Sequence, residues 1–314
     1  MSKRIALLFS GQGAQIAGMG RDLAQKYPVA ADLFARADSL LERSLSQIAF
    51  HGPAEELTLT KNCQPALFVH GLACLAALRQ EIGEFPIAAA AGLSLGEFTA
   101  HAAAGTFDFE TGLRLVEKRG LFMQEACEQT QGSMAAMIGG DEATVRTLAS
   151  ETDVDVANLN SPGQIVISGE TANVTLAVSL AKERGIRLAK LLNVAGAYHS
   201  RLMNSAFVRL GKELASIDLK TPRFPVICNT DAIPVSDPDE IRASLEDQVT
   251  GTVRWSDSME HLIDREGCEL FIELGPGGVL AGLLQRTRKG VPCVSISDCE
   301  SLQAAVSVMR SITI

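Results

Sequence analysis

The chain has 314 residues, 46% of them hydrophobic and 21% charged, and is expected to fold as two domains or as one large domain with an insertion. A formal net charge of -9 disfavours nucleic acid as a partner, because phosphate contacts need a basic surface. Seven scattered cysteines without a Cys-x-x-Cys pair disfavour a disulfide framework and a zinc site, so no bound metal is expected.

Membrane and export segments are also disfavoured. No uninterrupted apolar run reaches the ~18 residues of a membrane-spanning helix. The apolar segment behind the basic N-terminus is too short for a signal peptide. We therefore expect a soluble, cytoplasmic protein.

Strands and helices alternate along much of the chain. Residues 5–9 predict a buried strand that ends in a glycine turn, and helical patterns follow over 20–45. A nearly all-apolar helix is predicted over 63–83, then a short strand over 85–92 and a helix that starts at Ser94. A strand, glycine turn and helix recur at 269–287. This alternation predicts the α/β class, with a mostly parallel sheet covered by helices on both faces.

The middle of the chain follows a different order. Strands are predicted at 133–139, 154–161, 163–169 and 186–193, with helices at 141–152 and 171–185. The order βαββαβ is typical of a ferredoxin-like fold. We assign residues 129–196 to this small subdomain, and residues 1–128 and 197–314 to the large one. A ligand cleft is expected between them.

Residues 92–96 read Gly-Leu-Ser-Leu-Gly and lie between a predicted strand and a predicted helix. So sharp a turn would bring flanking side chains into collision, which explains the two glycines. The turn would expose the Ser94 hydroxyl beside the free N–H groups of a helix N-terminus, which suit an oxyanion. This context favours a nucleophile, and the alternative is a serine that only caps the helix.

A nucleophilic serine needs a base, and His199 is the candidate among five histidines. It follows the last strand of the small subdomain and precedes a helix, whose N-terminus would keep the ring neutral. His51, His70, His101 and His261 are assigned to structural or exposed positions. No acid is marked as a third catalytic member, and more than a hundred residues follow His199, which weakens an α/β-hydrolase assignment.

Residues 107–127 predict an amphipathic helix with Arg119 at the edge of its apolar face. An arginine there either extends along the apolar surface to water or binds an anion in a pocket. The pattern alone favours the first.

Seven segments resemble, in order, the malonyl-CoA:acyl-carrier-protein transacylases and the related acyltransferase domains of polyketide and animal fatty-acid synthases. They are GQGAQ at 11–15, GLSLGEFTA at 92–100, KRGLFMQEA at 118–126, NLNSPGQIVISG at 158–169, GAYHSRLM at 196–203, VRW at 253–255 and ELGPGGVL at 273–280. The resemblance covers about residues 5–288. It implies an α/β-hydrolase-like large domain that carries a ferredoxin-like insertion.

The resemblance also implies roles for individual residues. Ser94 would be the nucleophile and His199 its general acid and base. The backbone carbonyl of Gln248 would orient the histidine, so that no acid is needed. The N–H groups of Gln12 and Leu95 would form the oxyanion hole.

Two further residues would bind substrate. Arg119 would hold the free carboxylate of the malonyl group, and Met123 would line its pocket. Some positions depart from common family forms, among them Ser10 in place of a frequent proline and Ala14 in place of a frequent serine. Leu93 replaces a frequent polar residue, which leaves acyl selectivity less certain. Tyr198 resembles the phenylalanine of malonyl-selective members.

The implied reaction moves malonyl from malonyl-CoA to the phosphopantetheine thiol of holo acyl carrier protein through a malonyl-serine, for fatty acid synthesis. No permanently bound cofactor is expected, and the protein is expected to be a monomer. The alternatives are a serine esterase or thioesterase, a non-catalytic interaction domain, and an acyltransferase of a polyketide pathway.

Overall fold

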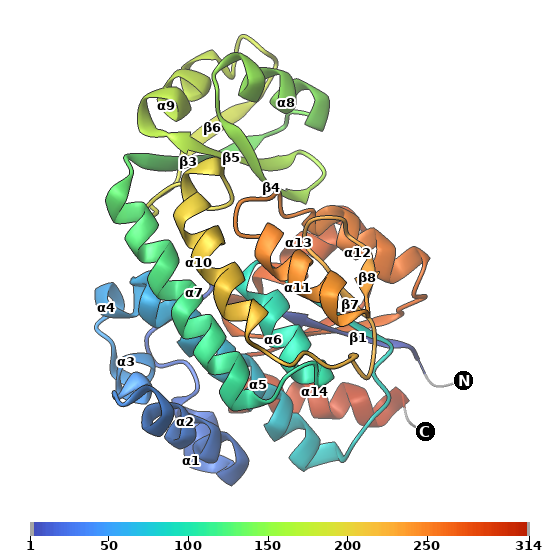
Figure 1. Cartoon of the computed structure of the whole chain (residues 1–314). Helices are drawn as coiled ribbons and strands as arrows, with labels where there is room; N and C mark the ends of the chain where they lie inside the picture. The colour runs from blue at the N-terminus through green and yellow to red at the C-terminus, as the bar shows by residue number, and fades with distance from the viewer. Residues whose placement is uncertain (1–2, 313–314) are drawn as a thin grey trace.

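A computed structural model describes residues 3–312, which contain two separate β-sheets (Figure 1). The larger sheet has the strand order β10-β9-β1-β2-β7-β8, and only β8 runs antiparallel to its neighbour. Its strands are β1 (Ile5–Phe9), β2 (Ala89–Gly92), β7 (Val226–Ile227), β8 (Pro234–Val235), β9 (Leu270–Leu274) and β10 (Cys293–Ile296). The predicted mostly parallel sheet is confirmed.

Helices cover both faces of this sheet, because successive side chains of a strand point to opposite sides. Ile5, Leu7 and Phe9 of β1 pack into one core, and Ala6 and Leu8 pack into the other. The first core is formed with α2 (Pro28–Leu41), α5 (Thr60–Ile82), α6 (Leu95–Ala104), α7 (Phe109–Gln129), α10 (Asn204–Ala215) and α14 (Cys299–Ile312). The second is formed with α12 (Trp255–Asp264) and α13 (Val279–Thr287).

Shorter helices complete the large part of the molecule. They are α1 (Arg21–Lys26), α3 (Leu45–His51), α4 (Ala54–Thr58), α11 (Pro238–Asp247) and the 3-10 turns η1 (Arg201–Met203) and η2 (Pro276–Gly278). Among the helices of residues 3–312, none combines the length and the hydropathy needed to span a bilayer.

The smaller sheet is antiparallel, with the order β4-β5-β3-β6. Its elements follow the chain as β3 (Gly132–Ile138), α8 (Glu142–Glu151), β4 (Asp155–Ser161), β5 (Gln164–Glu170), α9 (Thr171–Leu180) and β6 (Leu188–Leu191). They share a hydrophobic core of their own. The order βαββαβ is as predicted, and Figure 1 shows this unit at the top of the view, reached by the long helix α7. The boundaries at 129 and 196 stay a prediction.

Several predicted elements are shorter in the structure, because a strand needs a paired neighbour. The strand predicted over 85–92 begins only at Ala89, whose partner Ala6 lies near the start of β1. The strand predicted over 186–193 is paired only over Leu188–Leu191, along one side of β3. His51, which was assigned to a structural or exposed position, is the last residue of α3 and is exposed.

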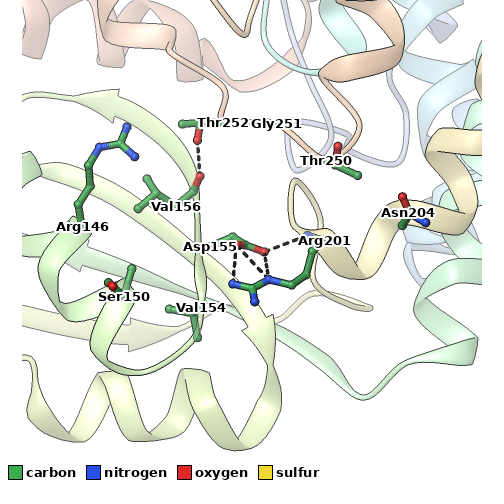
Figure 2. Close-up of a pocket in the computed structure, with 11 residues that line it drawn as sticks. Arg146, Ser150, Val154, Asp155, Val156, Arg201, Asn204, Thr250, Gly251 and Thr252 are labelled. Carbon is green, nitrogen blue, oxygen red and sulfur yellow. Dashed lines mark hydrogen bonds and ion pairs between the residues drawn. The ribbon is translucent and has the colours of Figure 1, made fainter.

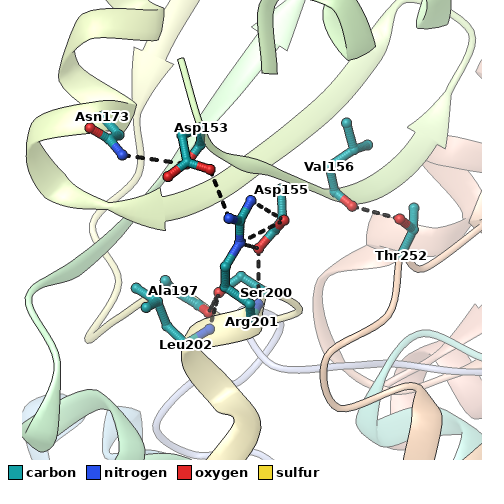
Figure 3. Close-up of polar contacts among 9 residues, drawn as sticks. All are labelled: Asp153, Asp155, Val156, Asn173, Ala197, Ser200, Arg201, Leu202 and Thr252. Atoms are coloured by element: carbon teal, nitrogen blue, oxygen red, sulfur yellow. Dashed lines mark hydrogen bonds and ion pairs between the residues drawn. The ribbon is translucent and has the colours of Figure 1, made fainter. Parts of the chain in front are cut away.

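A short extended segment joins the two parts of the molecule. Val253 pairs with β4, accepting from the N–H of Leu159 and donating to the carbonyl of Ala157, each at 2.8 Å. Beside it, the side chain of Arg201 contacts both Asp153 and Asp155 of the small subdomain (Figure 3).

A cavity of about 640 Å³ opens at this junction, lined from both subdomains (Figure 2). Arg146 and Val156 face it from the small subdomain. Arg201 and Thr252 face it from the segments that follow His199 and Gln248, respectively.

Candidate active site

Ser94 lies in the turn between β2 and α6, in a strained backbone conformation with φ 53° and ψ -106°. The turn has no room for side chains beside the serine. A Cβ on Gly92 would lie 1.9 Å from the backbone of Gly96, and a Cβ on Gly96 would lie 2.1 Å from the carbonyl oxygen of Phe9. The packing therefore confirms that both positions need glycine because side chains would collide.

The hydroxyl of Ser94 is used for a partner other than the helix. Ser94 is the N-cap residue of α6 but makes no side-chain capping bond. Its Oγ lies 2.8 Å from His199 Nε2, and His199 Nδ1 lies 2.7 Å from the carbonyl oxygen of Gln248. Because that carbonyl accepts, Nδ1 carries the proton and Nε2 is free to take the serine proton.

The pKa of His199 is lowered to about 4, first by burial and then by the nearby charge of Arg119. The imidazole is therefore neutral at physiological pH, as a general base must be. A neutral ring was expected, but for another reason. The turn that follows His199 is the 3-10 segment η1, and burial together with Arg119 is what disfavours the imidazolium.

The sequence pattern alone favoured an Arg119 side chain that extends to water, and this expectation is wrong. Arg119 is 1% exposed. Its Nη1 donates to Gln64 Oε1 at 2.7 Å, and its Nη2 donates to Ser94 Oγ at 3.0 Å and to Gln248 Oε1 at 2.6 Å. Its guanidinium group lies over the aromatic ring of Phe98. Burial lowers its pKa to about 10, so the guanidinium stays charged beside the serine.

Gln12 and Leu95 are the residues expected to bind the oxyanion. Leu95 is the first residue of α6, and Gln12 follows β1 and lines the same cavity as Ser94. Within residues 3–312, neither backbone N–H donates a hydrogen bond. The first N–H groups of a helix have no partner inside the helix, so they can bind an anion.

The cavity at Ser94 has a volume of about 510 Å³ and is lined by both subdomains. Met123 and Tyr198 form part of its wall on the large side, and Asn160 and Val166 on the small side. The Tyr198 hydroxyl is 2.6 Å from that of Thr60. The cleft expected between the subdomains is therefore present, and Ser94 and His199 line it.

Sequence reasoning missed the side chains that hold this site from behind. Asn229 Oδ1 accepts from the N–H of Ser94 at 2.7 Å, and the buried carboxylate of Glu97 accepts from the side chain of Gln248 at 2.9 Å. Gln64 positions Arg119. Glu97 reads as an ordinary first-turn acid, and nothing near Asn229 in the sequence marks it.

The other histidines lie away from the serine. His70 is buried, with Nε2 3.0 Å from the carbonyl oxygen of Ser297. His101 is buried beside Thr106, and burial lowers its pKa to about 3. His51 is exposed, and His261 lies 3.7 Å from a glutamate carboxylate.

A serine paired with a neutral histidine, at a helix N-terminus and beside a buried guanidinium, defines an enzyme that transfers acyl groups through its serine. The family model "Acyl transferase domain" matches residues 6–310. The chain belongs to this acyltransferase family.

Similar proteins match this chain over nearly their whole length. The chain is 42% identical over 315 residues to the malonyl CoA-acyl carrier protein transacylase of Bacillus subtilis, covering 99% of this chain and 98% of that protein. It is 38% identical over 309 residues to the Escherichia coli K12 protein of the same name, covering 97% and 99%. A solved transacylase of this name from Coxiella burnetii superimposes with a TM-score of 0.94 at 35% identity, covering 98% of both chains.

Proposed function

We propose that this protein transfers a malonyl group from malonyl-CoA to the phosphopantetheine thiol of acyl carrier protein, and so supplies fatty acid synthesis. The observation that carries the proposal is the buried guanidinium of Arg119, 3.0 Å from the hydroxyl of the serine–histidine pair. A fixed cation beside the nucleophile suits an acyl group that carries its own negative charge.

The first half of the reaction loads the serine. Ser94 Oγ attacks the thioester carbonyl carbon of malonyl-CoA while His199 Nε2 takes the hydroxyl proton. The N–H groups of Gln12 and Leu95 stabilise the oxyanion of the tetrahedral intermediate. The carbon–sulfur bond then breaks, and the CoA sulfur leaves with the proton from His199. A malonyl ester on Ser94 remains.

The second half repeats these steps with a different thiol. His199 takes the proton of the phosphopantetheine thiol, whose sulfur attacks the ester carbonyl carbon. The bond from that carbon to Ser94 Oγ breaks, and the serine recovers its proton from His199. The malonyl carboxylate pairs with Arg119 throughout. It accepts the hydrogen bond that Arg119 Nη2 donates to Ser94 Oγ in the free protein.

Two relatives bear on the acceptor. One solved structure that matches this chain with a TM-score of 0.93 at 36% identity is a malonyl-transacylase in complex with a type II polyketide acyl-carrier protein. A polyketide biosynthesis protein of Burkholderia thailandensis, ThaF, is 39% identical over 90% of this chain, but the match covers 24% of ThaF. The names of the relatives, malonyl CoA-acyl carrier protein transacylases, support the fatty-acid assignment, and a polyketide carrier is the second candidate acceptor.

Intact-mass spectrometry tests the proposal. Mixing with malonyl-CoA is expected to add one malonyl group to the protein, and holo acyl carrier protein is expected to remove it and gain it. The variant Ser94→Ala should show no adduct. Release of free malonate without loading of the carrier would instead support a thioesterase, and no adduct at all would support an interaction domain. Parallel reactions with fatty-acid and polyketide carriers separate the two pathways.

The oligomeric state and the cellular compartment belong to the same proposal. The protein acts as a monomer in the cytoplasm, without a permanently bound cofactor and without nucleic acid. All groups that the chemistry uses come from one chain, and all seven cysteines are unpaired thiols, which suits a reducing compartment. Light scattering on the purified protein checks the monomer, which a dimer mass would contradict.

A further inference from the structure

Glu97 is a buried carboxylate in the first turn of α6, three residues after the proposed nucleophile, and it is 0% exposed. A glutamate at this helix position commonly bonds back to the N–H of the N-cap residue. Here that N–H, from Ser94, donates to Asn229 Oδ1 at 2.7 Å instead. The Glu97 carboxylate is therefore available to other partners.

The hydrogen bonds to Glu97 come from segments that hold the site. Its Oε2 accepts from Gln248 Nε2 at 2.9 Å and from the N–H of Asn229 at 3.0 Å, and its Oε1 accepts from the Ser244 hydroxyl at 3.2 Å. The Asn229 side chain in turn donates to the carbonyl of Gly92 at 2.8 Å. Glu97 thus links the segment after β7 and the end of α11 to the turn that carries the serine.

The bond to Gln248 decides which end of its amide faces which neighbour. Nε2 donates to Glu97 and to the carbonyl oxygen of Ser94, so Oε1 is left to accept from Arg119 Nη2 at 2.6 Å. The backbone carbonyl of the same residue accepts from His199 Nδ1. If the amide turned over, its NH₂ group would face the guanidinium donor to donor and this bond would be lost.

Glu97 and Arg119 are also opposite charges on the two sides of that amide. Burial raises the pKa of Glu97 to about 7, against the bonds from Gln248, Asn229 and Ser244 and the charge of Arg119. Burial lowers the pKa of Arg119, and Glu97 opposes that shift. Among residues 3–312, the Cys228 thiol also interacts with Glu97; burial is the first cause that raises the pKa of Cys228, and Glu97 raises it further.

We propose that Glu97 is a positioning residue for acyl transfer. Its carboxylate holds the Gln248 amide in the orientation that places Arg119 and His199 against Ser94. The inference rests on the proposed function and extends it, because Glu97 does not line the substrate cavity and contacts none of the reacting atoms. All three groups at its oxygens, Gln248 Nε2, the Asn229 N–H and the Ser244 hydroxyl, donate to it, and only the ionised carboxylate accepts from all of them, so this is the active form.

Two substitutions separate its charge from its hydrogen bonds. Glu97→Gln has the same shape, and its oxygen can accept from Gln248 and Asn229 while its NH₂ donates to the Ser244 hydroxyl. This variant removes the charge and reverses the Ser244 bond, but keeps the acceptors for Gln248 and Asn229. Glu97→Ala removes both the charge and the acceptors, and leaves Gln248 Nε2 without its carboxylate partner.

The readout is the single-turnover rate of malonyl loading on Ser94, measured by intact mass across pH. In the wild type, the rate is expected to rise twice with pH. The lower rise is due to His199, and the upper rise occurs as Glu97 ionises near its pKa of about 7. Glu97→Gln should lack the upper rise and stay at the wild-type low-pH rate. Glu97→Ala should lose about 10²-fold at every pH, the usual effect of a misaligned site. If Glu97→Ala does not fold, Glu97→Gln decides alone.

Glu273→Gln is the matched control for a purely structural role. Glu273 is also 0% exposed, and burial raises its pKa as well. Its carboxylate accepts from the N–H groups of Leu280 and Ala281 and from the Ser295 hydroxyl. This variant should lose unfolding free energy and keep the upper rise.

The outcomes separate this inference from the proposed function. A wild-type protein that takes up no malonyl group overturns both. A wild type that loads, together with a Glu97→Gln variant that keeps the upper rise or matches Glu273→Gln in its profile, overturns the positioning role alone.

Discussion

The Ser94 hydroxyl lies between an imidazole and a guanidinium. His199 Nε2, at 2.8 Å, can take its proton, and Arg119 Nη2, at 3.0 Å, donates to its oxygen. In the free protein the guanidinium stabilises negative charge on that oxygen but disfavours a protonated His199. A substrate carboxylate that pairs with Arg119 therefore offsets its charge and makes the imidazole a stronger base at the moment of attack.

Replacing Arg119 with alanine is expected to separate acyl groups by charge. Malonyl loading should fall by roughly 10²–10³-fold, because the carboxylate loses a buried bidentate partner. Acetyl loading, which uses no such partner, should fall far less. Loading rates from malonyl-CoA and acetyl-CoA on the same preparation measure the ratio, and equal losses would contradict the assignment.

The pH profile should show the depressed pKa of His199. The imidazole works as a base only when neutral, so loading is expected to rise as pH passes about 4, its lowered pKa. In Arg119→Ala that lower rise should move toward the ordinary value of 6.5, and stop short of it because burial remains. Acetyl-CoA is the substrate for this comparison, and an unmoved rise would show that Arg119 does not act on the imidazole.

At the scale of elements, the position of the proposed nucleophile Ser94 depends on how closely α6 approaches the ends of β1 and β2. Apolar runs and glycines predicted β1, β2 and α6, because buried parallel strands and a sharp turn restrict composition. The short strands β7 and β8 were not predicted, since two residues carry no periodicity. The strand β10 was also missed, since it lies at the sheet edge and most of its residues are only half buried.

The substitution Gly96→Ala should test the close approach. Its new Cβ would lie 2.1 Å from the carbonyl oxygen of Phe9, so the turn must shift. We expect a loss of about 1–3 kcal/mol in the free energy of unfolding, and loss of malonyl loading. The measurements are urea unfolding and intact mass.

Gly282→Ala is the control for this prediction. Gly282 lies inside α13, and a Cβ there meets nothing within 4 Å. Alanine should stabilise the helix by about 0.5–1 kcal/mol and leave loading unchanged. A Gly96→Ala variant that behaves in the same way would mean that the turn has more room than the packing indicates.

At the scale of the whole molecule, the substrate cavity exists only because two subdomains meet. Arg201, two residues after His199, binds Asp155 and Asp153 of the small subdomain. The side chain of Arg201 is 57% exposed, so this junction contributes little to stability. Its position next to the catalytic loop indicates that it aligns the two halves of the cavity.

Arg201→Ala should therefore change function more than stability. We expect less than about 1 kcal/mol of lost unfolding free energy and a several-fold slower malonyl loading. Arg184→Ala is the control, because Arg184 forms a similarly exposed ion pair with Glu151 inside the small subdomain. Urea unfolding and single-turnover loading measure the two effects, and equal loading rates for both variants would contradict the alignment role.

The sequence by itself determined the α/β class, the βαββαβ insertion, the serine turn and, through seven ordered motifs, the family and the residues proposed to react. These follow from local periodicity and from residues adjacent in the chain. Only the tertiary structure decided that Arg119 is buried, that burial keeps His199 neutral, and that Glu97, Asn229 and Gln248 hold the serine turn together. Burial and hydrogen bonding depend on segments more than a hundred residues apart, which no local pattern records.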